Sequence, residues 1–359
     1  MNLSLFGWDD GWEAQFQSLA QDGLAPARVA LEHKQAFDLL SPDGLVNARC
    51  TGRLLHEARS RADLPAVGDW VTVRRQPTDS TGVIHAVLPR RTAFSRRTAG
   101  TAAEEQVVAA NVDTVLLVTG LDQNFNVRRI ERTLLMTWES GAQPVVVLNK
   151  TDLHGDPESA VAEAAAVAMG APVVALSAAQ GDGLDALAPW LVPGTTIALL
   201  GSSGVGKSTL INRLLGEERQ ATAEVSGSVG KGRHTTTRRE LILSPAGVII
   251  IDTPGMREFQ LWTADDDALD ATFSDIAQLS ASCRFNDCSH NREPGCAIRA
   301  ALDDGTLDPA RWQSFLKLGR EKEYAARRAD PRLERETKTH WKKINRSLRT
   351  ANRLRHGNW

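Results

Sequence analysis

The 359-residue sequence has no long hydrophobic run and only four cysteines. No apolar stretch approaches the roughly 20 residues that a membrane-spanning helix needs, so we expect no membrane partner. The N-terminal sequence MNLSLFGWDDGWEAQF has no basic segment followed by an apolar one, which excludes a secretory signal peptide. The composition is that of an ordinary globular protein long enough for two or three domains, and the expected location is cytoplasmic.

The net charge is also small, at −2, but it conceals two basic ends. Residues 331–359 contain nine Lys or Arg against two Glu, and residues 31–100 contain eleven against seven acidic residues. The middle of the chain has no such excess. This asymmetry suggests a polyanionic partner that is held by the two flanks.

Residues 1–30 are predicted to form an N-terminal helical extension. Trp8, Trp12, Phe16 and Leu19 are spaced as one face of a helix. The simpler interpretation is that this face packs on the next domain. The alternative is a surface on which nucleic-acid bases stack.

Short, imperfectly alternating runs at 33–40, 44–55, 66–75 and 81–89 predict a small β-barrel over residues 31–104. The segment VGDWV (67–71) resembles the turn and strand of oligonucleotide-binding (OB) barrels, which hold nucleic acid on one strand face and its loops. We expect four arginines on or beside one such loop and further positive charge from six more, and the alternative is that all ten are ordinary solvated surface. The four are Arg49, Arg53, Arg59 and Arg61, and the six are Arg74, Arg75, Arg90, Arg91, Arg96 and Arg97.

Residues 105–272 have a different pattern. Short continuous apolar runs such as VDTVLLVTG, QPVVVLNK and TTIALLGSSG each end in a polar loop, and helical stretches at 128–140 and 157–169 lie between them. This is typical of a parallel sheet with helices on both faces. Ligands of such sheets bind at the carboxyl ends of the strands.

A phosphate-binding loop follows the predicted strand TIALL and precedes the predicted helix STLINRLL. The glycines let backbone N–H groups turn towards phosphates, Lys207 can reach the β- and γ-phosphates, and the Ser208 hydroxyl can bind Mg²⁺. The predicted nucleotide-binding residues of this loop are Gly201, Ser202, Ser203, Gly204, Val205, Gly206, Lys207, Ser208 and Thr209.

A second phosphate-side motif, DTPG, follows the strand GVIIID. There Asp252 can hold the magnesium shell and the Gly255 N–H can meet the γ-phosphate. The basic, threonine-rich segment GKGRHTTTRR (230–239) resembles a switch whose threonine binds Mg²⁺ only when the γ-phosphate is present. Among Thr235, Thr236 and Thr237 we favour Thr236.

A guanine-reading motif, NKTD, follows the strand PVVVLN. Asp152 can accept hydrogen bonds from guanine N1–H and the exocyclic amine, Asn149 can support the loop, and the Lys150 stem can cover the base. Ser177-Ala178, after the next strand, is the usual companion loop. Because base recognition here precedes phosphate recognition in the sequence, the motifs predict a circularly permuted GTPase domain.

Residues 273–359 are predicted to form a zinc-binding helical module with a basic tail. Cys283, Cys288, His290 and Cys296 provide three thiolates and an imidazole, a ligand set suited to one tetrahedral structural Zn²⁺. The spacing is not one of the common zinc-finger patterns, and the alternative is three incidental cysteines beside a surface histidine. The tail could be an RNA-binding arm or a solvated helix.

The combination of an OB-type barrel, the permuted motifs NKTD, GSSGVGKST, GRHTTT and DTPG, and the Cys-x4-Cys-x-His-x5-Cys module resembles the bacterial ribosome small-subunit-dependent GTPase A (RsgA) family over essentially the whole chain. The resemblance implies a factor in late assembly of the small ribosomal subunit that contacts its rRNA and hydrolyses GTP when bound. We expect a monomer. The alternatives are a large-subunit assembly GTPase and an RNA-binding protein that uses GTP as a conformational ligand.

The residue after DTPG is Met256, where many signalling GTPases have a glutamine that orients water. A thioether is a poor hydrogen-bond acceptor, so another polar group must orient the attacking water. The expected group is His234, with Lys207 and Thr236 as the other catalytic residues. The alternative is that His234 contacts only RNA or solvent.

Overall fold

The computed structural model describes most of the chain. The predicted residues His234, Thr236 and Gly255 and the basic tail 331–359 lie outside the described residues. The described ranges are 2–19, 22–76, 81–97, 105–123, 125–168, 170–217, 240–252, 272–285, 287–291 and 293–329, with side chains up to residue 320.

The N-terminal part of the chain forms a closed β-barrel with the strand order β1-β2-β3-β5-β4, in which β4 pairs back onto β1. The pairing is antiparallel except between β3 and β5. A helix, α2, lies between β3 and β4 in the sequence. The OB-type barrel is therefore confirmed. Its elements are β1 (Ala25–Glu32), β2 (Phe37–Ser41), β3 (Gly44–Cys50), α2 (Gly52–Glu57), η2 (Arg61–Asp63), β4 (Trp70–Arg75) and β5 (Thr81–Val87).

Two details of the barrel differ from the sequence reading. The first strand begins at Ala25, before the boundary expected at residue 31, because its apolar run was assigned to the N-terminal extension. Residues 52–55 are helical and not part of a strand, because the Thr51 side chain accepts from the Leu54 N–H at 3.1 Å and caps a helix there. The domain boundaries themselves stay predictions.

The N-terminal segment packs on the outside of the barrel. It comprises η1 (Leu3–Phe6) and α1 (Asp10–Leu19), and Trp12 and Phe16 are buried. The rings of Trp8 and Trp70 meet edge to face with centroids 4.6 Å apart. These aromatic side chains are used for packing, which confirms the simpler of the two interpretations.

The central sheet has the strand order β10-β9-β8-β11-β13-β12. All neighbours are parallel except β12 and β13, so the carboxyl ends of the parallel strands lie at one edge. The phosphate-loop strand β11 lies in the middle of the sheet although it comes fourth in the sequence. The strands are β8 (Thr114–Gly120), β9 (Gln143–Asn149), β10 (Val173–Leu176), β11 (Thr196–Leu200), β12 (Glu240–Leu243) and β13 (Ile249–Asp252).

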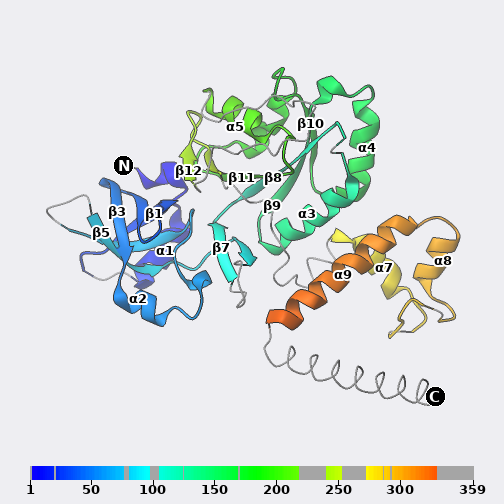
Figure 1. The fold of residues 1–359 in the computed structure, drawn as a ribbon, viewed down its shortest axis with the longest axis horizontal. Coiled ribbons are helices and arrows are strands. Elements are labelled where there is room, and N and C mark those ends of the chain that lie inside the picture. The colour runs from blue at the N-terminus through cyan, green and yellow to red at the C-terminus, as the bar shows by residue number, and fades with distance from the viewer. Residues whose placement is uncertain are drawn as a thin grey trace, which may run out of the picture.

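Helices cover both faces of this sheet (Figure 1). Side chains of α3 and α4 pack on one face, with Leu134 and Ala164 at the centre, and those of α5 and η4 pack on the other, with Leu187 and Leu210. The expected helices at 128–140 and 157–169 are thus present. The elements are α3 (Val127–Glu139), η3 (Thr151–Leu153), α4 (Pro157–Ala168), η4 (Leu184–Trp190) and α5 (Lys207–Leu215).

The barrel and the central sheet are joined by strand pairing and by a buried arginine. Leu31 of β1 pairs with Glu240 of β12, and the hairpin of β6 (Ala93–Arg97) and β7 (Glu105–Ala110) lies between the two sheets in the sequence. Arg28 is 1% exposed and donates to the carbonyl of Asn111 at 3.1 Å and to Thr196 Oγ1 at 2.9 Å. Burial lowers the pKa of Arg28 to about 10, so it remains charged at neutral pH.

The C-terminal module consists of α7 (Ser274–Ala281), α8 (Ala297–Asp303) and α9 (Pro309–Ala329). Its apolar core includes Phe273, Ile276 and Trp312, and Leu135 of α3 belongs to the same cluster. The module therefore packs against α3 of the central domain, as Figure 1 also shows. Among the described helices, none has the length and apolar character needed to cross a bilayer.

Candidate nucleotide site and metal centre

The segment between β11 and α5 has the geometry of a phosphate-binding loop. Gly206 has a φ of 96°, and a Cβ there would lie 2.2 Å from Asn149 Nδ2. A Cβ on Gly201 would lie 2.2 Å from the carbonyl oxygen of Val118. Glycine is thus required at both ends of the loop, where the backbone turns and approaches its neighbours closely.

The side chain of Lys207 lies over this loop. Its Nζ donates to the carbonyl of Gly201 at 2.8 Å and to that of Ser202 at 2.6 Å. Ser208 and Thr209 follow in the first turn of α5, and Asp252 ends the neighbouring strand β13. An ammonium group, a hydroxyl and a carboxylate therefore lie at the carboxyl edge of the sheet, at a helix N-terminus where an ammonium and backbone N–H groups can bind phosphate.

Asn149 connects the NKTD loop to the phosphate loop. It is 2% exposed, and its Nδ2 donates to the carbonyl of Val205 at 2.8 Å. Its Oδ1 accepts from the Ala178 N–H at 2.9 Å. One buried amide thus joins three loops that lie far apart in the sequence, and both of its polar ends are satisfied.

Lys150 and Asp152 of the NKTD motif are also held in place. Lys150 has a left-handed φ of 69°, and its Nζ lies 2.6 Å from Asp122 Oδ2. Asp152 Oδ1 accepts from the Ser177 hydroxyl at 2.6 Å. Because this bond holds one oxygen of the Asp152 carboxylate, the orientation of the whole group is set before any base binds.

Three further residues at this site were missed by the sequence reading. Asp122 follows the end of β8, and this position after a buried strand was the available signal. Arg213 of α5 donates to the carbonyls of Ala178 and Ala179 at 3.0 and 2.6 Å, and Arg129 of α3 donates to Ser202 Oγ at 2.8 Å. No local pattern marks these two arginines, since their partners lie elsewhere in the sequence.

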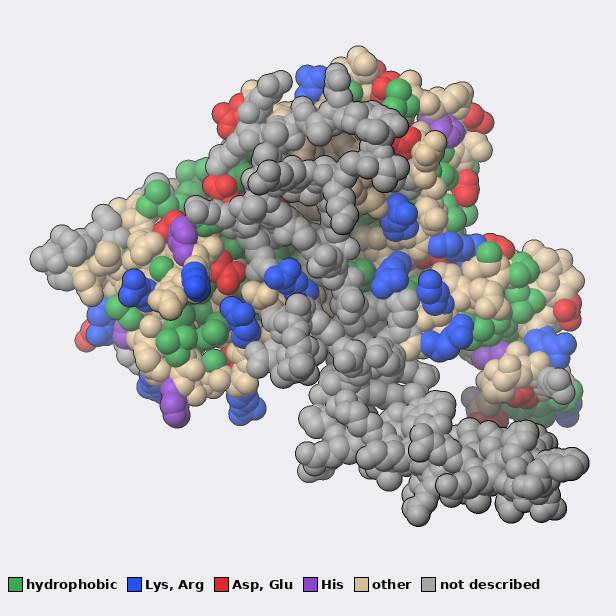
Figure 2. All heavy atoms as spheres, viewed as in Figure 1, with side chains coloured by type: hydrophobic (Ala, Val, Ile, Leu, Met, Phe, Trp, Pro, Cys, Tyr) green, Lys and Arg blue, Asp and Glu red, His purple; other side chains and the backbone are tan. Residues whose placement is uncertain are grey.

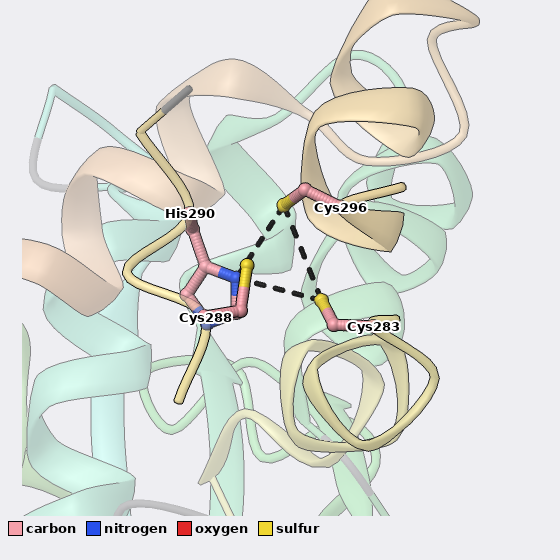
Figure 3. A group of neighbouring side chains, drawn as sticks. All are labelled: Cys283, Cys288, His290 and Cys296. Carbon is pink, nitrogen blue, oxygen red and sulfur yellow. Dashed lines mark hydrogen bonds between the residues drawn. The ribbon is translucent and has the colours of Figure 1, made fainter. Parts of the chain in front are cut away.

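The four predicted metal ligands come together in the C-terminal module (Figure 3). Their ligand atoms all lie within 4.8 Å of one another. His290 Nδ1 lies 3.6 Å from Cys283 Sγ and 3.5 Å from Cys296 Sγ, and the two sulfurs are 4.0 Å apart. Tetrahedral zinc bonds of about 2.3 Å to sulfur and about 2.0 Å to nitrogen require separations close to these, so the cluster can hold a metal ion.

The surroundings of this cluster also suit a metal. The Ser280 hydroxyl lies 3.0 Å from His290 Nε2, which leaves Nδ1 directed at the sulfurs. Desolvation acts to raise the pKa of the Cys283 thiol, but hydrogen bonds from the Ala297 and Ile298 N–H groups and from the other two thiols outweigh it and lower that pKa. Desolvation and the two neighbouring thiols raise the pKa of Cys288 to about 11, so without a metal the thiolate, which is the form that binds metals, is favoured at Cys283 and not at Cys288.

Two of the barrel arginines show that some of the predicted basic residues serve the fold. Arg90 forms an ion pair of 2.7 Å with the buried Asp69, and Arg91 forms one of 2.6 Å with Asp9. Arg49, by contrast, is exposed.

The parallel sheet, with a base-reading loop that precedes its phosphate loop, defines a circularly permuted P-loop GTPase domain between a barrel and a metal-binding module. The RsgA GTPase family profile matches residues 87–262. A small ribosomal subunit biogenesis GTPase RsgA from Opitutus terrae is 60% identical over all of both chains. The chain therefore belongs to the RsgA GTPase family, and it is a GTP hydrolase.

Solved structures agree with this assignment. YjeQ from Thermotoga maritima is similar with a TM-score of 0.60 and 26% identity, covering 83% of this chain and 98% of that one. YloQ, described as a circularly permuted GTPase, is similar in fold with a TM-score of 0.58 and 23% identity, covering 84% of this chain and 96% of that one.

Proposed function

We propose that this GTPase binds the small ribosomal subunit and acts in its late maturation, and that it hydrolyses GTP to GDP and phosphate when bound there. The observation that carries the proposal is the full-length, 60% identical relative that is named a small ribosomal subunit biogenesis GTPase. Since the partner is the ribosomal subunit, the protein acts in the cytoplasm. We propose that it does so as a monomer.

Guanine recognition rests on Asp152. Its carboxylate accepts the base N1–H and exocyclic amine, which adenine cannot offer in the same arrangement. Ser177 holds this carboxylate at 2.6 Å, while Asn149 ties the loop to Val205 at 2.8 Å. The aliphatic stem of Lys150 covers the ring, and the Ala178 loop closes over the opposite edge.

The phosphates bind to the N–H groups of residues 201–209 and to Lys207. The carbonyls of Gly201 and Ser202 that now hold Lys207 Nζ are neutral acceptors, so a phosphate oxygen outcompetes them for the ammonium. Ser208 is the proposed Mg²⁺ ligand, Asp252 supports the magnesium shell, and Mg²⁺ neutralises charge on the phosphates.

The remaining catalytic roles fall on residues outside the described ranges. Thr236 completes the magnesium shell, Gly255 donates to the γ-phosphate, and His234 orients the attacking water. We propose that their segments take up the catalytic arrangement on the ribosome, which makes hydrolysis depend on the subunit.

The metal of the C-terminal module is one structural Zn²⁺, held by Cys283, Cys288, His290 and Cys296. Four protein ligands leave no open position for water, so this ion stabilises the module and performs no chemistry. The separations of 3.5–4.0 Å among the Cys283, Cys296 and His290 ligand atoms support this assignment.

The basic flanks provide affinity for rRNA. Lys and Arg side chains lie on the barrel and beside the C-terminal module (Figure 2). Arg49, Arg53 and Arg59 are exposed and can contact phosphate oxygens. Arg53 also forms a solvent-exposed ion pair with Glu57, which a phosphate can replace. Such contacts release counterions, so binding should weaken steeply with salt.

Co-sedimentation with purified subunits tests the proposal. With a non-hydrolysable GTP analogue bound, the protein should pellet with small subunits and not with large ones. This binding should fall as the salt concentration is raised. Arg49→Ala and truncation after Pro331 should weaken it, whereas Arg320→Ala, at an exposed site on α9, is the control for loss of a single positive charge. Preference for large subunits would support the large-subunit alternative instead.

A further inference from the structure

A buried ion group joins the central domain to the C-terminal module. Glu131 of α3 is fully buried, and its Oε1 accepts from Arg311 NH1 of α9 at 2.5 Å and from Arg128 NH1 at 2.9 Å. Arg311 is 6% exposed and also pairs with Asp275 of α7 at 2.6 Å. Breaking such a buried pair leaves an uncompensated charge, so the two helices are held in one arrangement.

Packing reinforces this joint. The Arg311 guanidinium lies over the Phe273 ring, 4.9 Å from its centroid. Trp312, the next residue, stacks on Phe315 and meets the imidazole of the metal ligand His290 edge to face at 5.8 Å. The ion group and the metal cluster are therefore parts of one packed unit, which bears directly on α3.

The same turn of α3 contacts the phosphate loop. Arg129, between the two ion-group residues Arg128 and Glu131, donates from NH1 to Ser202 Oγ at 2.8 Å. Neighbouring side chains of one helical turn thus face two different partners, the C-terminal module and the phosphate loop. Since a helix turn moves as a rigid unit, a shift of the module that carries this turn of α3 with it displaces Arg129 from Ser202.

We propose that Arg129 is a positioning residue of the phosphate loop and that Glu131 and Arg311 set its place. Nucleotide affinity then depends on docking of the C-terminal module, and the first turn of α3 couples the two. This inference rests on the proposed role of residues 201–209 in phosphate binding. By linkage, nucleotide binding also strengthens docking of the module.

The first test measures GDP and GTP-analogue affinity for Arg129→Ala, Glu131→Gln and the double variant. Each single substitution should weaken nucleotide binding about fivefold or more. The double variant should bind nucleotide no more weakly than the more affected of the two single variants. Arg320→Ala, which removes an exposed arginine of α9 that donates to the Leu316 carbonyl of its own helix, should leave affinity unchanged. Additive effects of Arg129→Ala and Glu131→Gln would overturn the proposal.

A second readout needs no nucleotide. Amide hydrogen exchange over residues 201–209 of the nucleotide-free, full-length protein should be about threefold faster or more in Glu131→Gln and Arg311→Lys than in wild type. Arg311→Lys keeps the charge but not the two-pronged geometry, so it tests the joint without leaving Glu131 uncompensated. Unchanged exchange in both variants would overturn the proposed coupling through α3, even if GTP binds normally. Faster exchange would support this coupling, even if GTP did not bind.

Discussion

The Asn149 side-chain amide and the Val205 carbonyl are 2.8 Å apart, although the two residues are separated by more than fifty positions in the chain. This bond joins the base-reading loop to the phosphate loop in the interior of the protein. The two loops follow β9 and β11, which lie on either side of β8 in the sheet. The place of these strands in the sheet, and not their order in the sequence, brings the two halves of the GTPase site together.

We predict that Asp152→Asn exchanges guanine for xanthine specificity. In its proposed role the carboxylate accepts two hydrogen bonds from guanine, and an amide would present a donor at one of these positions. GDP affinity should fall by roughly 100-fold or more, since hydrogen bonds to a charged group contribute about 1.5–3 kcal/mol each. Competition binding with GDP, XDP and ADP measures this, and an unchanged GDP affinity would remove Asp152 from the base site.

Arg213 should affect the base site without touching the nucleotide phosphates. Its guanidinium holds the Ala178 and Ala179 carbonyls, so Arg213→Ala should loosen the loop beside the base. We expect about a three- to tenfold loss of GDP affinity, in line with the loss of one or two partly exposed hydrogen bonds. Arg213→Lys should recover part of it. Equal affinities in all three proteins would show that the loop holds its place alone.

One equivalent of zinc should be present in the purified protein and should be lost on chelation. Removal of the ion should unfold the C-terminal module and leave the barrel intact, because the metal bonds contribute folding energy in such modules. Metal analysis and hydrogen exchange over residues 272–320 measure the two effects. Undiminished zinc in a Cys283→Ala/Cys288→Ala variant would contradict the assignment, and Cys50→Ala is the matched control.

The joint between the module and α3 should be sensitive to acid. Burial acts to raise the pKa of Asp275, but the hydrogen bond and charge of Arg311 outweigh it and hold the pKa below the usual value of 3.8. A lowered folded-state pKa gives stability that is present above the unfolded-state pKa and lost as the pH falls through the folded-state one. The stability difference between wild type and Asp275→Asn should therefore shrink below about pH 4.

Urea unfolding of both proteins across this range measures that difference, and the comparison cancels the effect of acid on the metal ligands. A difference that stays constant from neutral pH to pH 3 would mean that the Asp275 carboxylate does not contribute through its charge.

The sequence predicted the elements that local patterns specify. Continuous apolar strands, Gly206 before Lys207, and the spacing of Cys283 and Cys296 each restrict the chain through nearby residues. The sequence could not predict contacts that depend on distant partners. Arg90 was predicted as basic surface, yet the buried Asp69 pairs with it, and Arg28 joins the two sheets through partners more than eighty residues away.

The first barrel strand was missed for a related reason. Its apolar residues come only a short turn after the N-terminal helix, which ends at Leu19, and its pairing with β2 and β4 assigns it to the barrel. The roles of His234 and Thr236 stay predictions, since both residues lie outside the described ranges.

The central claim is that this protein is a GTPase whose hydrolysis depends on the small ribosomal subunit and on His234. The most direct measurement is the steady-state rate of GTP hydrolysis with and without purified small subunits, for wild type and His234→Ala. We predict a slow rate for the free protein, a rate at least about tenfold higher with subunits, and loss of most of this stimulation in His234→Ala, in line with the 10²–10⁴-fold typical of a positioned acid–base group. Equal rates with and without subunits would contradict the account, and full stimulation in His234→Ala would contradict the role of that residue.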